Sequence, residues 1–184
     1  MRGFVFDNLE HVMCACLLFA RLGDLVTTYL ATPTLELETN PIARRLGWKF
    51  GVAGLLVCLL PYWSLDAAMV VFVASLLASA GNAGRVWLTR ALGEQRQMEL
   101  LLEAASRSQA WQAYAGVAAS AGFIALTGSA LMFFYPSPEE NWGFWFGLGI
   151  VGYGLVIAIY GALWVRRLFR QASSAASVAP SRAT

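Results

Sequence analysis

The sequence predicts an all-α integral membrane protein: a bundle of about five transmembrane helices plus a short amphipathic helix on the cytoplasmic side. Three observations lead to this prediction. Hydrophobic residues make up 58% of the 184-residue chain and charged residues only 13%, whereas about a quarter of the residues in a soluble domain are charged. The apolar residues fall in long blocks, each close to the roughly 20 residues that cross the hydrocarbon layer. Finally, the basic residues gather on one side of these blocks.

Each block has recognisable ends. The first is expected to stay in the protein as a span, because no small-residue cleavage pattern closes it as in a signal peptide. The second begins at Pro41 behind Asn40, whose side chain can cap a helix. Gly93 is expected to end the third. The predicted spans are therefore residues 9–31, 41–61, 65–92, 110–135 and 142–165.

The remaining segments are short. Residues 94–109 form an amphipathic stretch, expected to lie at the membrane interface or to extend the third span. Residues 1–170 would then be a single transmembrane domain. Residues 171–184 are rich in alanine and serine without apolar periodicity, which predicts a disordered cytoplasmic tail.

Orientation follows from the positive-inside rule. Eleven of the 13 basic residues fall on one side of the predicted spans, namely Arg44, Arg45, Lys49, Arg85, Arg90, Arg96, Arg107, Arg166, Arg167, Arg170 and Arg182. The opposite side has only Arg2, and its last loop carries Glu139 and Glu140. This predicts an N-terminus outside and a C-terminus in the cytoplasm, which requires an odd number of spans.

Small residues at four-residue spacing mark expected helix contacts, because they let backbones approach closely in lipid. The third span has such a stripe from Ser75 to Asn82. The fourth has Gly116 and Ser120, and the fifth has Gly143 and Gly147, then Gly154, Ala158 and Ala162. Packing within the bundle explains these stripes, and a homo-oligomer contact through the fifth span is the alternative.

Ionisable residues inside the spans define a polar centre. Such groups are costly in a membrane and usually pair. Arg21, Asp24 and Thr28 share one face of the first span. Asn82 of the third span is expected at the same depth, with Arg85 one turn further on. Glu38 and Asn40 lie on the same membrane side. The predicted centre is therefore Arg21, Asp24, Thr28, Glu38, Asn40, Asn82 and Arg85.

Two motifs in this region resemble a known pattern. Gly23-Asp24-Leu25-Val26-Thr27-Thr28, followed by Glu38-Thr39-Asn40-Pro41, is similar to the signature of a family of small prokaryotic integral membrane proteins of unknown function. The resemblance covers about residues 20–90, and Asn82 is a further match. It implies a bacterial inner (plasma) membrane location and a shared polar centre, but no reaction.

The polar centre has a structural and a functional interpretation. Arg21 and Asp24 fit an ion pair that locks the bundle, or a contact for an ion, proton or substrate. Glu38, Asn40 and Pro41 are explained by a capped helix start. No metal site is expected, since Asp24 and Glu38 lie beside arginines and Cys14 and Cys16 point to nearly opposite helix faces. With one histidine in the chain, a haem held by two histidines is excluded, and no other cofactor is indicated.

These observations leave several functions open. We favour a structural or accessory membrane protein, which assembles with itself or with a membrane complex through its small-residue faces. The alternative is a small transporter or ion-coupled carrier that uses the centre around Asp24. An intramembrane enzyme is not favoured, because no nucleophile or metal motif accompanies Asp24 and Glu38. The bilayer is the expected partner. Nucleic acid is not, because topology already explains the arginines, which would also attract anionic lipid.

Overall fold

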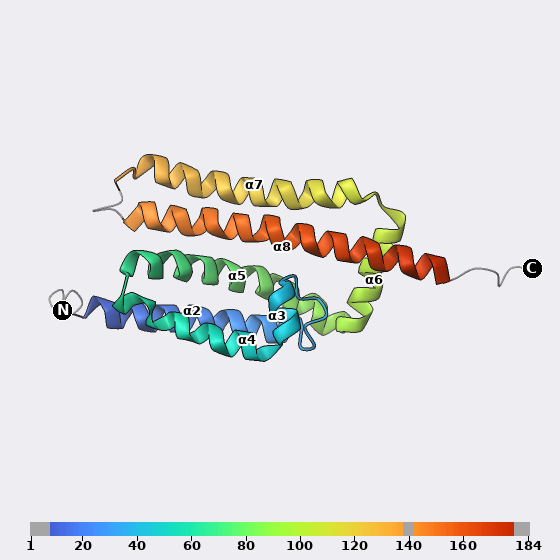
Figure 1. The fold of residues 1–184 in the computed structure, drawn as a ribbon, viewed down its shortest axis with the longest axis horizontal. Helices are drawn as coiled ribbons and strands as arrows, with labels where there is room; N and C mark the ends of the chain where they lie inside the picture. Colours follow the sequence, from blue (N-terminus) through green and yellow to red (C-terminus); the bar gives the residue numbers. More distant parts are fainter. Residues whose placement is uncertain (1–7, 138–141, 179–184) are drawn as a thin grey trace, which may run out of the picture.

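Four long helices lie side by side in one row, in the order α7, α8, α5 and α2 (Figure 1). This computed structural model describes residues 8–137 and 142–178, and all regular secondary structure in those ranges is helical. The elements are α2 (Leu9–Ala31), α3 (Pro41–Leu46), α4 (Trp48–Ala53), η1 (Gly54–Tyr62), α5 (Leu65–Leu92), α6 (Glu94–Arg107), α7 (Ala110–Phe134) and α8 (Trp142–Val178). Four residues on which the predicted orientation partly depends lie outside the described ranges, namely Arg2, Glu139, Glu140 and Arg182.

The four long helices α2, α5, α7 and α8 are each long and apolar enough to cross a membrane. Their starts agree with the predicted spans. Ser64 begins α5 by accepting a hydrogen bond from the backbone N–H of Ala67 at 3.2 Å. Gly93 ends it with a φ of 77°, in the left-handed region that favours glycine. The start of α2 and the end of α8 lie at opposite ends of the molecule along the direction of the long helices (Figure 1).

The second predicted span is wrong as a single helix over residues 41–61. Gly47, with a φ of 65°, separates α3 from α4. From Gly54 the chain then winds as a 3₁₀-helix, η1, with Pro61 inside it. In an α-helix the proline ring would clash with the carbonyl group of Val57, four residues earlier, which disfavours α-helical winding at that end. Only Trp48–Tyr62 remains as a short apolar helical stretch, and it packs beside α2 and α5.

Helix α8 extends beyond the predicted fifth span, and residues 171–178, predicted to lie in a disordered tail, are helical. Helix α8 continues to Val178 because its last turns have something to cover. Leu168 and Ala172 are buried against Ala105 of α6. The amphipathic face of α6 therefore packs on α8, with Met98, Leu101 and Leu102 around this contact. Residues 179–184 lie outside the described part of the chain.

Glycines let α7 and α8 touch through their backbones. A Cβ atom built on Gly128 would lie 2.5 Å from the carbonyl oxygen of Gly147, and one on Gly147 would lie 2.6 Å from that of Gly128. Two turns away, a Cβ on Gly154 would lie 3.0 Å from the carbonyl oxygen of Ala121. The small-residue face of the fifth span is thus occupied within the chain, by α7.

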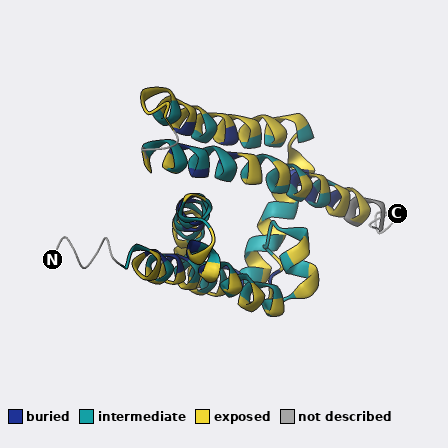
Figure 2. Cartoon of the chain, turned by 60° about the vertical axis from the view of Figure 1, so that its left-hand side comes forward, coloured by how far each residue is buried: buried dark blue, intermediate teal, exposed yellow. Residues whose placement is uncertain are grey.

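The outer faces of the row are apolar and exposed (Figure 2). Phe19, Phe123 and Phe133 are each at least 70% exposed, and Leu17 is the largest fully buried side chain. At most 22% of the residues in the most apolar window of any long helix are buried. Among the described residues, the helices therefore turn more hydrophobic surface outward than inward.

The glycine contact generates a stability prediction. Gly147→Ala should destabilise the protein by about 1–3 kcal/mol, because the new methyl group would meet backbone that cannot move aside. Gly152→Ala on the same helix is the control, since a Cβ there has open space within 4 Å. It should be neutral or stabilising by up to about 1 kcal/mol. Thermal unfolding in detergent, followed by circular dichroism, measures both, and equal shifts for the two variants would contradict the close packing.

Candidate functional site

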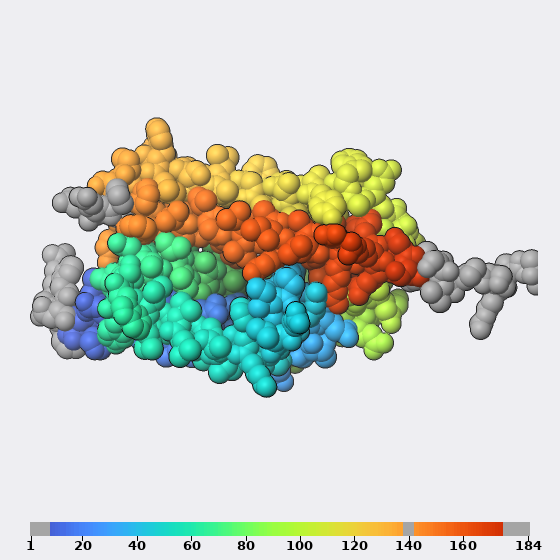
Figure 3. All heavy atoms as spheres, viewed as in Figure 1, coloured from blue at the N-terminus to red at the C-terminus, as the bar shows by residue number. Residues whose placement is uncertain are grey.

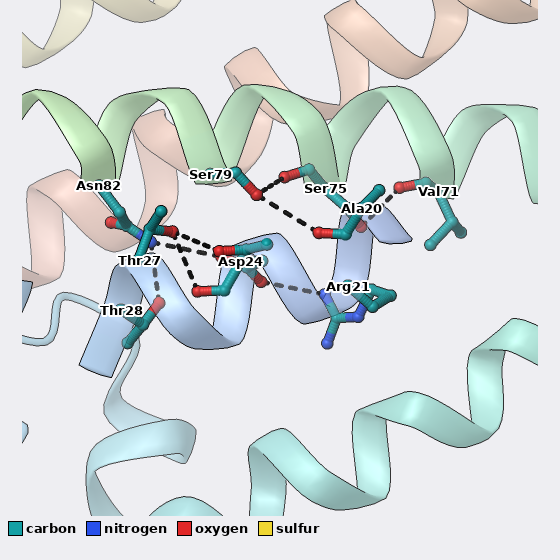
Figure 4. Close-up of polar contacts among 10 residues, drawn as sticks. Ala20, Arg21, Asp24, Thr27, Thr28, Val71, Ser75, Ser79 and Asn82 are labelled. Carbon is teal, nitrogen blue, oxygen red and sulfur yellow. Dashed lines mark hydrogen bonds and ion pairs between the residues drawn. The ribbon is translucent and has the colours of Figure 1, made fainter. Parts of the chain in front are cut away.

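The carboxylate of Asp24 is held from two helices. Its Oδ2 lies 3.2 Å from Nη1 of Arg21 on α2, and its Oδ1 accepts a hydrogen bond from Nδ2 of Asn82 on α5 at 3.3 Å (Figure 4). The same Asn82 amide donates to Oγ1 of Thr28 at 2.8 Å. The side chains of Arg21 and Asp24 are each 19% exposed. Four predicted residues, Arg21, Asp24, Thr28 and Asn82, are therefore joined by direct contacts, and we call them the Asp24 centre.

The backbones of α2 and α5 come close at this level. Ser79 donates to the carbonyl oxygen of Ala20 at 3.4 Å, and a Cβ on Gly23 would lie 3.4 Å from its hydroxyl oxygen. The stripe of small residues on α5 thus faces α2, which is what places Asn82 within reach of Asp24.

Arg21 points away from α5, toward the interrupted second segment (Figure 4). A Cβ on Gly54, the first residue of η1, would lie 2.5 Å from Nη2 of Arg21. The guanidinium therefore rests where the helix has no side chain. Its buried Nε has no hydrogen-bond partner. Sequence reasoning missed this contact, although Gly51 and Gly54 are one helical turn apart and on one face.

Three predicted residues lie outside these direct contacts. Glu38 accepts a hydrogen bond from the backbone N–H of Asn40 at 2.7 Å, and Asn40 caps α3 by accepting from Ile42 at 2.9 Å. The charge of Glu38 still acts on Asp24 across the gap. Arg85 is exposed and acts electrostatically on Tyr153 of α8. The capped helix start is thus confirmed for Asn40.

A second polar cluster was not predicted. The loop between α2 and α3 wraps around the carboxylate of Glu94, the first residue of α6. Backbone N–H groups of Thr34, Glu36 and Leu37 donate to it at 3.0, 3.0 and 3.3 Å. Hydroxyl groups of Thr32 and Thr34 donate as well. We call this arrangement the Glu94 cradle. The only hint in the sequence is an acidic residue directly after the helix-ending Gly93.

The cradle changes the acidity of Glu94. Burial favours the neutral acid and would raise the pKa. The hydrogen bonds from Thr32, Thr34 and Leu37 favour the carboxylate and outweigh burial, so the pKa of Glu94 lies below its ordinary value of 4.5. The cradle is therefore complete at neutral pH, and it fixes the loop and α6 to each other.

The described residues hold no group of three or more His, Cys, Asp or Glu side chains that could bind a metal ion. His11 packs edge-on against the ring of Tyr62, with 5.5 Å between ring centroids. Cys14, Cys16 and Cys58 are free thiols. The two polar clusters described above are thus the Asp24 centre and the Glu94 cradle.

Comparison with protein-family models, with curated proteins and with solved structures found no match for the chain. The interpretation of the site therefore depends on its geometry.

The Asp24 centre predicts strong coupling between its two charges. Arg21→Gln and Asp24→Asn should each destabilise the protein by about 2–4 kcal/mol, because each leaves a partly buried charge without its partner. The double variant should be less destabilised than the sum, with a coupling energy of about 0.5–3 kcal/mol. Unfolding in mixed detergent micelles gives all four corners of this cycle, and strict additivity would show that the pair is not an interacting unit.

The Glu94 cradle predicts a pH effect. Because the folded-state pKa lies below the unfolded value, the stabilisation is complete above about pH 4.5 and is lost as the pH falls toward the folded-state pKa. Hydrogen exchange at Thr34, Glu36 and Leu37 should therefore lose protection in acid. At neutral pH, Glu94→Ala should lower protection about tenfold. Glu99→Ala is the control, since Glu99 pairs only with Arg96 in the contacts described. Unchanged protection in Glu94→Ala would exclude the cradle.

Proposed function

We propose that this chain is a five-pass integral membrane protein with a structural or accessory role, in which the Asp24 centre is an internal lock. The observation that carries the proposal is that both carboxylate oxygens of Asp24 are engaged by partners within the chain. A carboxylate with both oxygens already in contact with the protein is less available to a solute than a free one. Apolar, exposed outer faces support the membrane location, since soluble proteins rarely expose such large apolar surfaces.

The second segment can complete the fifth pass despite being broken. A 3₁₀-helix rises about 2.0 Å per residue and an α-helix about 1.5 Å. The six residues of α4 and nine of η1 therefore extend over about 27 Å, close to the thickness of the hydrocarbon layer. With this pass the N-terminus lies outside and the C-terminus in the cytoplasm, as the basic residues predict. The resemblance in the Asp24 and Glu38 motifs fits an inner-membrane location.

The outer face of α7 is the assembly surface in this proposal. Helix α7 packs along α8 and makes no other extensive helix contact among the described residues. Gly116 and Ser120 are exposed on it, and a Cβ on Gly116 would have open space within 4 Å. A second membrane helix could approach this face closely.

Crosslinking tests the assembly. In a background without Cys14, Cys16 and Cys58, Gly116→Cys should give disulfide-linked dimers in membranes or a crosslink to a co-purifying protein. Leu155→Cys, at an exposed position on α8, should give neither. A monomer without any partner in mild detergent, and no crosslink at position 116, would remove the accessory role.

A small carrier is the second candidate, for one specific reason. The buried Nε of Arg21 has no partner, and it lies next to the interrupted α4–η1 segment. Transporter sites are typically formed where membrane helices are broken. In this function Asp24→Asn should abolish proton or solute flux in proteoliposomes, while Asp66→Asn, an exposed change at the start of α5, should not. Flux at background level in the wild type and in both variants would exclude the carrier function.

A further inference from the structure

An open groove lies between α6 and the last turns of α8. Its volume is about 480 Å³, and its lining includes Met98 and Leu102 of α6 with Arg167, Arg170 and Ser174 of α8. The loop between α2 and α3 closes one side, where Nη1 of Arg167 donates to the carbonyl oxygen of Glu36 at 3.1 Å. In Figure 3 the blue and cyan atoms of this loop and α3 lie against the red end of α8.

The groove carries a net positive charge, because two arginines, Arg167 and Arg170, line it against the single carboxylate of Glu36. The ion pairs among the described residues are Arg21–Asp24, Arg96–Glu99 and Arg107–Glu103, so neither Arg167 nor Arg170 has a carboxylate within ion-pair distance. Arg44 adds repulsion at Arg167, and only the charge of Glu36 opposes it. The guanidinium of Arg167 is held in place by the Trp164 ring, 5.2 Å away. An anion in the groove would relieve the repulsion.

A neighbouring hollow shows that the charge is local. It shares Met98, Leu102 and Glu36 with the groove, but it is lined otherwise by Glu94, Glu99, Gln95 and Thr34, without a basic residue. The two hollows therefore have opposite charge on the two sides of the same apolar ridge of α6. An anionic ligand would enter the α8 side and be repelled from the other.

The chemistry of the groove specifies an amphiphile. Two arginines can bind a phosphate by directed hydrogen bonds, while Met98 and Leu102 offer an apolar wall that a free phosphate ion would not use. The arginines follow directly on the apolar part of α8, which places them at headgroup depth if the protein is inserted as proposed above. We propose that the groove between α6 and α8 binds the headgroup of an anionic phospholipid. This inference rests on the membrane insertion in the proposed function, and goes beyond the assembly role.

Native mass spectrometry of the full-length protein tests the proposal, with phosphatidylglycerol and zwitterionic phosphatidylcholine as probes. The wild type should retain phosphatidylglycerol preferentially. The double variant Arg167→Gln/Arg170→Gln should bind it about tenfold or more weakly, as expected for two charges at an anionic surface. The matched control is Arg90→Gln/Arg166→Gln, which removes the same charge at exposed positions outside the groove, and it should stay within about twofold of wild type.

Each other outcome overturns the proposal. Equal losses in both double variants would indicate general surface charge, and no loss in either would exclude the groove. Displacement of the lipid by inorganic phosphate as effectively as by short-chain phosphatidylglycerol would indicate a phosphate site without lipid specificity. Arg170→Gln alone guards against misfolding, since the guanidinium of Arg170 makes none of the described hydrogen bonds and only its backbone carbonyl accepts one, from Ser174. This variant should weaken binding about threefold.

Failure of the membrane proposal itself would look different. A protein that alkaline carbonate extracts from membranes is not inserted, and the proposed function would then fail together with the lipid site. A protein that stays in the membrane but shows no preference for phosphatidylglycerol would lose the lipid site alone.

Discussion

The hydrogen-bonded carboxylate of Asp24 is the constraint on which the arrangement of the helices depends. It ties α2 to α5 through Asn82 and, through Arg21, reaches the glycine at the start of η1. In a low-dielectric environment a charged group is tolerated only with its partners in place. Sliding α2 along α5 by one turn would separate Asp24 from Asn82 and leave a charge unsatisfied. One side chain therefore fixes the register of two helices and the position of a third segment.

The remaining helices are added to this pair by close backbone contact. Gly149 brings α8 against α5, where a Cβ would lie 2.9 Å from the carbonyl oxygen of Val70, and Gly128 and Gly147 bring α7 against α8. The result is a helical bundle whose main apolar cluster lies between α2, η1 and α5, with α8 packed against it and α7 on the far side of α8. Hydrogen bonds thus specify how α2 packs on α5, whereas the close fit of glycines specifies how α8 packs on α5 and α7 on α8. Beyond the C-terminal ends of α2 and α5, the Glu94 cradle and the packing of α6 on α8 hold the connecting segments together.

Much of this could be predicted from the sequence, because it follows from local chemistry. Gly93 and Ser64 mark helix ends, and the apolar blocks give the four long helices. Asp24 and Asn82 could be paired because both descend the same distance along their helices. The break of the second span was missed, since Gly54 lies in an apolar stretch that reads as continuous and Gly47, between Arg45 and Lys49, reads as part of the first helical turns. The extension of α8 and the cradle were missed for another reason: Leu168, Ala172 and the loop amides acquire partners only when α6 folds back, which no local pattern encodes.

The winding of η1 has a mechanical consequence. Its nine residues would become about 4.5 Å shorter if they changed from 3₁₀ to α-helical winding, because the rise per residue falls by about 0.5 Å. The change would also turn one end relative to the other by about half a revolution. Because η1 connects Gly54 to the turn before α5, Gly54 and the start of α5 could not both keep their present positions. The contact between the guanidinium of Arg21 and Gly54 therefore depends on the 3₁₀ winding of η1.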